Sequence, residues 1–121
     1  MNPKMAHVCI HVLDLDRSVA FYKEAFGLEP VREKGPEDGS FKLVFLANDA
    51  CDFQLELTWN ADREEPYNQG GHDIHLAFAT DDLDGLRAKH EEMGIVSFVN
   101  ERMGIYFVED PDGFFIEVVP A

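Results

Sequence analysis

Two histidines and two glutamates stand at matching places in the two halves of this 121-residue sequence. His7 and His75 each open an apolar segment, HVCIH in the first half and HLAFA in the second. Glu56 and Glu117 each lie between apolar residues, in LEL and IEV. Two neutral imidazoles and two carboxylates are donors that divalent transition metals accept. If the two halves are related by a pseudo-twofold axis, these four side chains would form a metal site.

Each of the four residues also has a simpler interpretation when it is taken alone. A strand histidine is more often hydrogen-bonded within the fold than bound to a metal, and a strand carboxylate usually faces solvent. The repeat favours the metal, because two carboxylates that face each other repel and cost stability. A divalent cation removes that cost. The residues alone leave both interpretations open.

The positions of these side chains depend on an internal repeat. Alignment of His7 with His75 places the DLD motif at 14–16 opposite the DLD motif at 82–84 without a gap. Each half is predicted to form one strand, one helix that begins after an N-capping aspartate, and three further strands. The first half has these elements near 6–12, 16–26, 28–34, 40–47 and 52–58, and the second near 73–79, 83–93, 95–100, 104–109 and 114–119.

The predicted fold class is α+β, with two βαβββ repeats that form a curved mixed sheet groove. We expect a single domain over 1–121, made of modules at about 5–59 and 72–119 with a polar linker at 60–71. Alternation along the strands places His7, Cys9 and His11 on one face of the first strand. By the same rule Glu56 shares its face with Gln54 and Thr58, in the segment FQLELTWN.

Composition excludes several classes of function. The formal net charge is −14, with 24 acidic against 10 basic residues, which argues against nucleic acid or an anionic membrane as a partner. No apolar run reaches the roughly 18 residues of a membrane span, and the first residues lack the apolar region of a signal peptide. Cys9 and Cys51 have no metal-binding or redox spacing, which suggests reduced thiols and a cytoplasmic location.

Three segments carry a resemblance to a known family: LELTWN at 55–60, IHLAFA at 74–79 and FVEDPDGFFIEVV at 107–119. The chain resembles glyoxalase I (lactoylglutathione lyase) of the vicinal oxygen chelate superfamily, over nearly its whole length. In that family the metal ligands are the opening histidine and the late glutamate of each half. The resemblance therefore implies His7, Glu56, His75 and Glu117 as metal ligands.

The resemblance also implies the reaction, in which the hemithioacetal of methylglyoxal and glutathione isomerises to S-lactoylglutathione through a metal-bound enediolate. A divalent metal stabilises the anionic oxygens, and a nearby carboxylate moves the proton between adjacent carbons. We expect Glu117 to be this base and Glu56 to be a possible second proton carrier. Nickel or cobalt is the favoured metal and zinc the alternative. A homodimer with the site at its interface is expected.

Three residues are candidates for binding the thiol part of the substrate. Asn60 matches a family position that contacts glutathione, although by itself it would be interpreted as a turn residue. His11 stands where the family often has an arginine, so one cation is missing and the identity of the thiol is open. Arg102 either contacts an anionic group or is a solvated loop residue. Cys9 could be a soft extra ligand, but a small cysteine more commonly packs in a sheet.

Two other functions remain possible on the sequence. One is another enzyme of the same superfamily, with epimerase-type proton transfer on a different thioester. The other is a non-catalytic binder of small molecules, which would take up no divalent ion.

Overall fold

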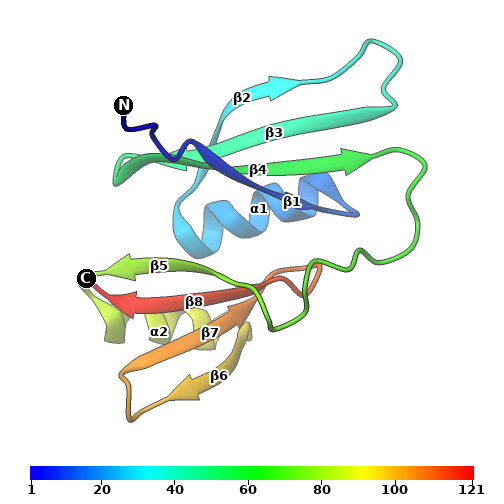
Figure 1. Cartoon of the computed structure of the whole chain (residues 1–121). Helices are drawn as coiled ribbons and strands as arrows, with labels where there is room; N and C mark the ends of the chain where they lie inside the picture. Colours follow the sequence, from blue (N-terminus) through cyan, green and yellow to red (C-terminus); the bar gives the residue numbers. More distant parts are fainter. The chain divides into compact units, whose positions relative to one another are not determined.

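The computed structural model describes residues 1–121, and the chain folds into two compact units, Met1–Tyr67 and Asn68–Ala121. The division falls inside the segment 60–71 that the sequence suggests as a linker. Both units have the order strand, helix and three strands (Figure 1). The predicted α+β class with two βαβββ repeats is confirmed.

The first unit forms a four-stranded mixed sheet with the strand order β1-β4-β3-β2. Its elements are β1 (His7–His11), α1 (Leu15–Phe26), β2 (Glu29–Lys34), β3 (Phe41–Asn48) and β4 (Cys51–Asn60). Strand β1 is parallel to β4, and the other two pairings are antiparallel.

The second unit repeats this topology with the strand order β5-β8-β7-β6. Its elements are β5 (Leu76–Thr80), α2 (Leu83–Glu92), β6 (Val96–Asn100), β7 (Ile105–Glu109) and β8 (Phe115–Pro120). Strand β5 is parallel to β8. His75 was expected inside the first strand of this half, but it lies immediately before β5. No helix in the structure is both long and apolar enough to cross a membrane.

Capping residues explain where the helices begin and where the first one ends. The carboxylate of Asp14 accepts a 3.1 Å hydrogen bond from the backbone N–H of Arg17, and Asp82 accepts one of 3.0 Å from Gly85. Gly27 ends α1 in the left-handed conformation, with φ at 66°, which glycine adopts without steric cost. The repeated DLD motif therefore fixes the start of each helix.

Strand alternation separates the apolar core from the polar face of each sheet. Leu55 and Leu57 of β4 are buried, as are Ile116 and Val118 of β8. The intervening glutamate of each strand points to the opposite face. Each sheet thus keeps one face for its apolar core and presents its central carboxylate on the other.

Candidate active site

The first unit pairs a histidine with a glutamate. His7 opens β1, and the parallel register places Cys9 opposite Glu56 on β4. Nε2 of His7 lies 3.3 Å from Oε1 of Glu56. The Glu56 side chain is only 11% exposed, while that of His7 is 42% exposed. The imidazole therefore remains open to a ligand, whereas the carboxylate is largely enclosed.

The second unit builds the same pair by the same register. Ala77 of β5 lies opposite Glu117 of β8, and Nε2 of His75 lies 3.3 Å from Oε1 of Glu117. The ring plane of each histidine is also nearly perpendicular to that of a phenylalanine. The ring centroids are 5.5 Å apart for His7 and Phe45 and 5.4 Å apart for His75 and Phe107. The four predicted ligands thus form two separate histidine–glutamate pairs, one in each unit.

The donor chemistry of each pair fits part of a metal site. Two donors on one ion, each with a bond of about 2.1 Å, lie roughly 3 Å apart, close to the observed 3.3 Å between nitrogen and oxygen. Each pair supplies one imidazole and one carboxylate, which is half of a four-donor set. No group of three or more His, Cys, Asp or Glu side chains is gathered to hold a metal.

A short hydrogen-bond chain fixes the second oxygen of Glu56. The hydroxyl of Thr58 donates a 2.6 Å hydrogen bond to Oε2 of Glu56. Sγ of Cys9 lies 3.2 Å from the same hydroxyl oxygen. Sγ of Cys9 also lies 3.8 Å from the carbonyl oxygen of Ile10, to which the thiol can donate. Cys9 and Thr58 therefore both lie beside the carboxylate of Glu56.

These contacts also set the ionisation of the two groups. Burial alone would raise the pKa of the Glu56 carboxyl, but hydrogen bonds from Thr58 and Cys9 and the nearby His7 and His11 hold that pKa below its usual range. Burial raises the pKa of the Cys9 thiol, and the contact with Thr58 opposes this only in part. Glu56 is thus held as a carboxylate and Cys9 as a neutral thiol.

Glu117 lacks the corresponding support. The position of Thr58, two residues after the glutamate, is occupied by Val119, and the position of Cys9 by Ala77. Neither side chain has a group that can donate a hydrogen bond. The two glutamates therefore share their histidine contact and differ in the hydrogen bonds that Thr58 and Cys9 give to Glu56 alone.

Two of the predicted substrate residues meet at a third residue that sequence reasoning missed. The amide of Asn60 donates a 3.2 Å hydrogen bond to the hydroxyl of Tyr67, and the rings of His11 and Tyr67 are 4.9 Å apart. The guanidinium of Arg63 lies over the Tyr67 ring, 4.2 Å from its centroid. It also donates hydrogen bonds to the carbonyl oxygens of residues 65 and 66. Tyr67 lies in the polar segment after β4, where no pattern distinguished it.

Arg102 is in a different environment. It lies in the exposed turn between β6 and β7, in the second unit. The structure therefore does not join it to the cluster of His11, Asn60 and Tyr67 in the first unit.

Comparisons with known proteins show the family of the chain. The Glyoxalase/Bleomycin resistance protein/Dioxygenase superfamily model matches residues 4–118. The lactoylglutathione lyase of Pseudomonas aeruginosa is 31% identical, over 95% of this chain and 81% of its own. That of Neisseria meningitidis serogroup B is 33% identical, over 96% of this chain and 89% of its own.

Two solved structures share the fold of this chain. The trypanothione-dependent glyoxalase I of Leishmania major superposes with a TM-score of 0.83 at 30% identity, over 98% of this chain and 87% of its own. The fosfomycin resistance protein FosX of Listeria monocytogenes shares the fold, with a TM-score of 0.73 at 19% identity, over 100% of this chain and 93% of its own. The chain therefore belongs to the Glyoxalase/Bleomycin resistance protein/Dioxygenase superfamily and, within it, to the family of the lactoylglutathione lyases.

Proposed function

We propose that this protein isomerises the hemithioacetal of methylglyoxal and glutathione to S-lactoylglutathione. The observation that carries the proposal is the pairing of a histidine with a glutamate at 3.3 Å, built twice by the same strand register. Membership of the lactoylglutathione lyase family supports the choice of reaction. The repeat supplies two imidazoles and two carboxylates, which is the donor set that the reaction needs.

In this proposal His7, Glu56, His75 and Glu117 hold one divalent cation. Nickel or cobalt is favoured and zinc is the alternative, since imidazole and carboxylate suit all three. When bound, the metal supplies Lewis acidity to the substrate oxygens. The chain supplies the two histidines as neutral donors, and Glu56 as a carboxylate whose second oxygen is already occupied by Thr58.

Proton transfer is the task of Glu117. The reaction moves a proton from one carbon to its neighbour, so a carboxylate has to accept the proton and then return it. Glu117 suits this role because no hydroxyl fixes its second oxygen, whereas Glu56 is held by Thr58. Glu56 remains a possible second carrier, but the hydrogen bonds that hold its pKa below the usual range weaken it as a proton acceptor.

The remaining residues position the substrate. His11, Asn60 and Tyr67 form a polar cluster in the first unit, and we assign the thiol part of the substrate to this cluster. Arg102 is a further candidate for an anionic group. The working form is a homodimer in which the metal site lies at the interface between the chains.

The test begins with metal content and continues with turnover. Protein stripped of metal and reloaded with nickel, cobalt or zinc is mixed with methylglyoxal and glutathione, and the thioester product is followed by its ultraviolet absorption. We expect turnover with nickel or cobalt. Absence of turnover with every divalent metal, or turnover of an acyl-CoA thioester instead, would contradict the proposed function.

The same assay tests the role of Glu117. Glu117→Gln keeps the size of the side chain and removes its ability to accept a proton, so kcat should fall by about 10²- to 10⁴-fold. Glu92→Gln, at the exposed end of α2, is the matched control and should leave kcat unchanged. Equal activity of the two variants would remove Glu117 from the base role.

A further inference from the structure

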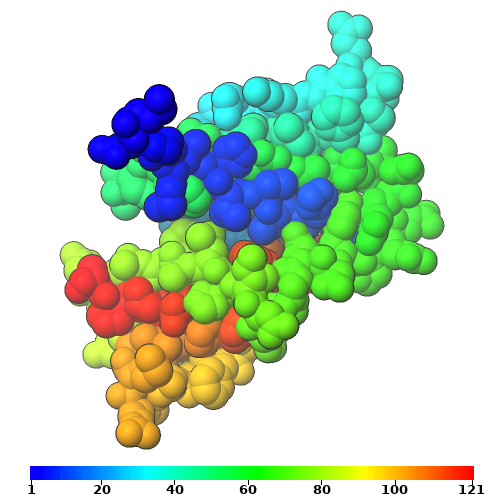
Figure 2. Space-filling model, viewed as in Figure 1, coloured from blue at the N-terminus to red at the C-terminus, as the bar shows by residue number.

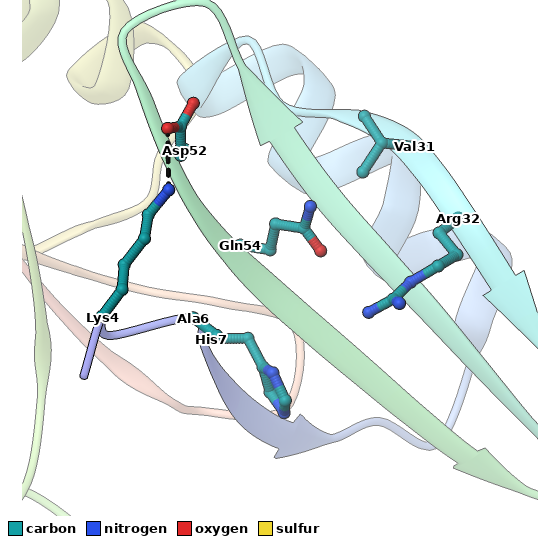
Figure 3. A pocket seen from close by; sticks show the side chains of 7 residues that line it. All are labelled: Lys4, Ala6, His7, Val31, Arg32, Asp52 and Gln54. Carbon is teal, nitrogen blue, oxygen red and sulfur yellow. Dashed lines mark hydrogen bonds and ion pairs between the residues drawn. The ribbon is translucent and has the colours of Figure 1, made fainter.

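A depression of about 360 Å³ lies on the polar face of the first unit, next to the proposed metal ligand His7. It is lined by Lys4, His7, Val31, Arg32, Asp52 and Gln54. Figure 3 shows the guanidinium of Arg32 turned toward Gln54 and His7 across the sheet. Figure 2 shows the N-terminal segment, in dark blue, at the surface, and the lining residues Lys4, Arg32 and Asp52 are exposed to solvent.

The charges around the depression differ from those of the chain as a whole. The chain has a formal net charge of −14, yet two cationic side chains, Lys4 and Arg32, line this depression. Nζ of Lys4 is paired with Asp52 at 2.9 Å. The guanidinium of Arg32 lies 4.1 Å over the ring of Phe45 and forms no ion pair. A cation–π contact uses none of the guanidinium N–H groups as a donor to an oxygen, so these groups remain available to an anion.

The internal repeat shows that the fold does not require this polarity. Arg32 pairs with Phe45, and in the second unit Phe98 pairs with Phe107 at the same register, after the same strand irregularity. Gln54, two residues before Glu56, corresponds to Phe115. In the second unit this place is therefore aromatic, with Phe107 and Phe115 stacked at 4.2 Å. The same backbone arrangement thus accommodates either aromatic or polar side chains at this place. The first unit has the cationic Arg32 here.

We propose that this depression binds a carboxylate of the substrate, with Arg32 as the main contact and the amide of Gln54 as a second donor. The inference rests on the proposed function, because His7 places the depression beside the proposed reacting centre. Two sources of the carboxylate share this chemistry. One is the glycyl carboxylate of the thiol peptide, and the other is a carboxylate on the dicarbonyl part. Arg32 is thus a substrate-binding residue, and the charge of Lys4 is offset by its ion pair with Asp52.

The test uses Arg32→Gln, with Lys34→Gln as a control that removes the same charge from the same strand outside the depression. KM and kcat are measured for methylglyoxal with glutathione, for methylglyoxal with the glycyl ethyl ester of glutathione, and for 4,5-dioxopentanoate with the ester. Arg32→Gln should raise KM about ten- to hundredfold for substrates that keep the bound carboxylate. Lys34→Gln should leave KM unchanged.

The three substrates distinguish the sources. If the thiol peptide supplies the carboxylate, Arg32→Gln affects only the reaction with unmodified glutathione. If the dicarbonyl part supplies it, Arg32→Gln affects only the reaction of 4,5-dioxopentanoate. An active wild-type protein in which Arg32→Gln and Lys34→Gln behave alike with all three substrates would overturn this inference and leave the proposed function intact.

A binding measurement covers the case in which the wild-type protein turns over no hemithioacetal. The proposed function then fails, and calorimetric titration with glutathione, its ethyl ester and 4,5-dioxopentanoate tests the depression by itself. Binding of glutathione or 4,5-dioxopentanoate that weakens about tenfold or more in Arg32→Gln but not in Lys34→Gln would support the carboxylate site. Equal binding to both variants, or no binding of any of the three, would overturn it.

Discussion

The hydroxyl of Thr58 donates a 2.6 Å hydrogen bond to Oε2 of Glu56, while Val119 occupies the corresponding position beside Glu117. This is the main chemical difference between two pairs that otherwise match in register and in distance. A hydrogen bond to the charged form stabilises a carboxylate and lowers its basicity. The repeat therefore allows a direct comparison between a carboxylate that has a hydroxyl donor, Glu56, and one that has none, Glu117.

Moving the hydroxyl from residue 58 to residue 119 should move the hydrogen bond from Glu56 to Glu117. In Val119→Thr a new hydroxyl donates to Glu117, so its basicity falls and kcat should drop by about tenfold with little change in KM. In Thr58→Val Glu56 loses its donor, and kcat should change by less than about threefold because Glu56 is not the main base. The measurement is the dependence of kcat on pH for each variant. A larger loss of kcat in Thr58→Val than in Val119→Thr would reverse the roles.

Much of the fold follows from the sequence because the determining signals are local. The DLD motif caps both helices, and alternation in β4 and β8 separates buried leucines and valines from the central glutamates. Those signals also identified the histidine and the glutamate of each pair, whose Nε2 and Oε1 atoms lie 3.3 Å apart. The relation between the two pairs depends on contacts distant in sequence, so the four-ligand metal site stays a prediction.

Other features could not be predicted, for physical reasons. The register shifts between Pro30 and Arg32, so counting alternate residues along β2 does not give the face of Arg32. Tyr67 is placed by a loop whose shape depends on contacts from Arg63 to backbone carbonyls. No periodic pattern encodes such contacts. Neither Arg32 nor Tyr67 is marked as a site residue by a pattern in the sequence.

The cluster around Tyr67 gives a prediction about the thiol. His11 lies against the Tyr67 ring, with the ring centroids 4.9 Å apart. His11→Arg adds a permanent positive charge and a flat donor group at this place. KM for the glutathione hemithioacetal should fall several-fold, and kcat should stay within about twofold. His11→Gln is the control and should not lower KM. An increase in KM for His11→Arg would show that the cluster does not hold an anionic thiol peptide.

The buried pair in the second unit makes a prediction about alkaline stability. Nδ1 of His90 lies 2.9 Å from the hydroxyl of Tyr106, and both side chains are almost fully buried. Burial raises the pKa of Tyr106 from 10.0 to about 12. The unfolded chain therefore loses this proton first as the pH rises. The contribution of Tyr106 to the free energy of unfolding is complete below pH 10 and declines between the two pKa values. It amounts to about 2–3 kcal/mol.

Chemical denaturation at a series of pH values from 8 to 12 measures this contribution. Tyr106→Phe cannot ionise, so its free energy of unfolding should fall less steeply above pH 10 than that of the wild-type protein. The variant should also be less stable at pH 8 by about 1 kcal/mol, because the hydrogen bond with His90 is lost. Parallel curves for the two proteins above pH 10 would refute the assignment of the decline to Tyr106.

Metal binding can be measured without catalysis. Nickel at about 100 times its dissociation constant should stabilise the folded protein by about 2.7 kcal/mol, seen as a rise in Tm. His7→Ala and His75→Ala should each lose most of this rise, since each removes one proposed ligand. His72→Ala is the control, because His72 also contacts a carboxylate, Glu109, at 3.0 Å but is not a proposed ligand. The control should keep the rise. Equal losses in all three variants would indicate unspecific binding by histidines.

The location of the site can be decided by mixing two inactive variants. His7→Ala disables the first unit of a chain, and Glu117→Gln disables the second. If each site combines the first unit of one chain with the second unit of its partner, a mixed dimer has one site with both defects and one with none. Unfolding and refolding of an equal mixture should then restore about a quarter of the wild-type activity, because about half of the dimers are mixed and each has one intact site of two. A site built within one chain would give no recovery, since every chain carries a defect.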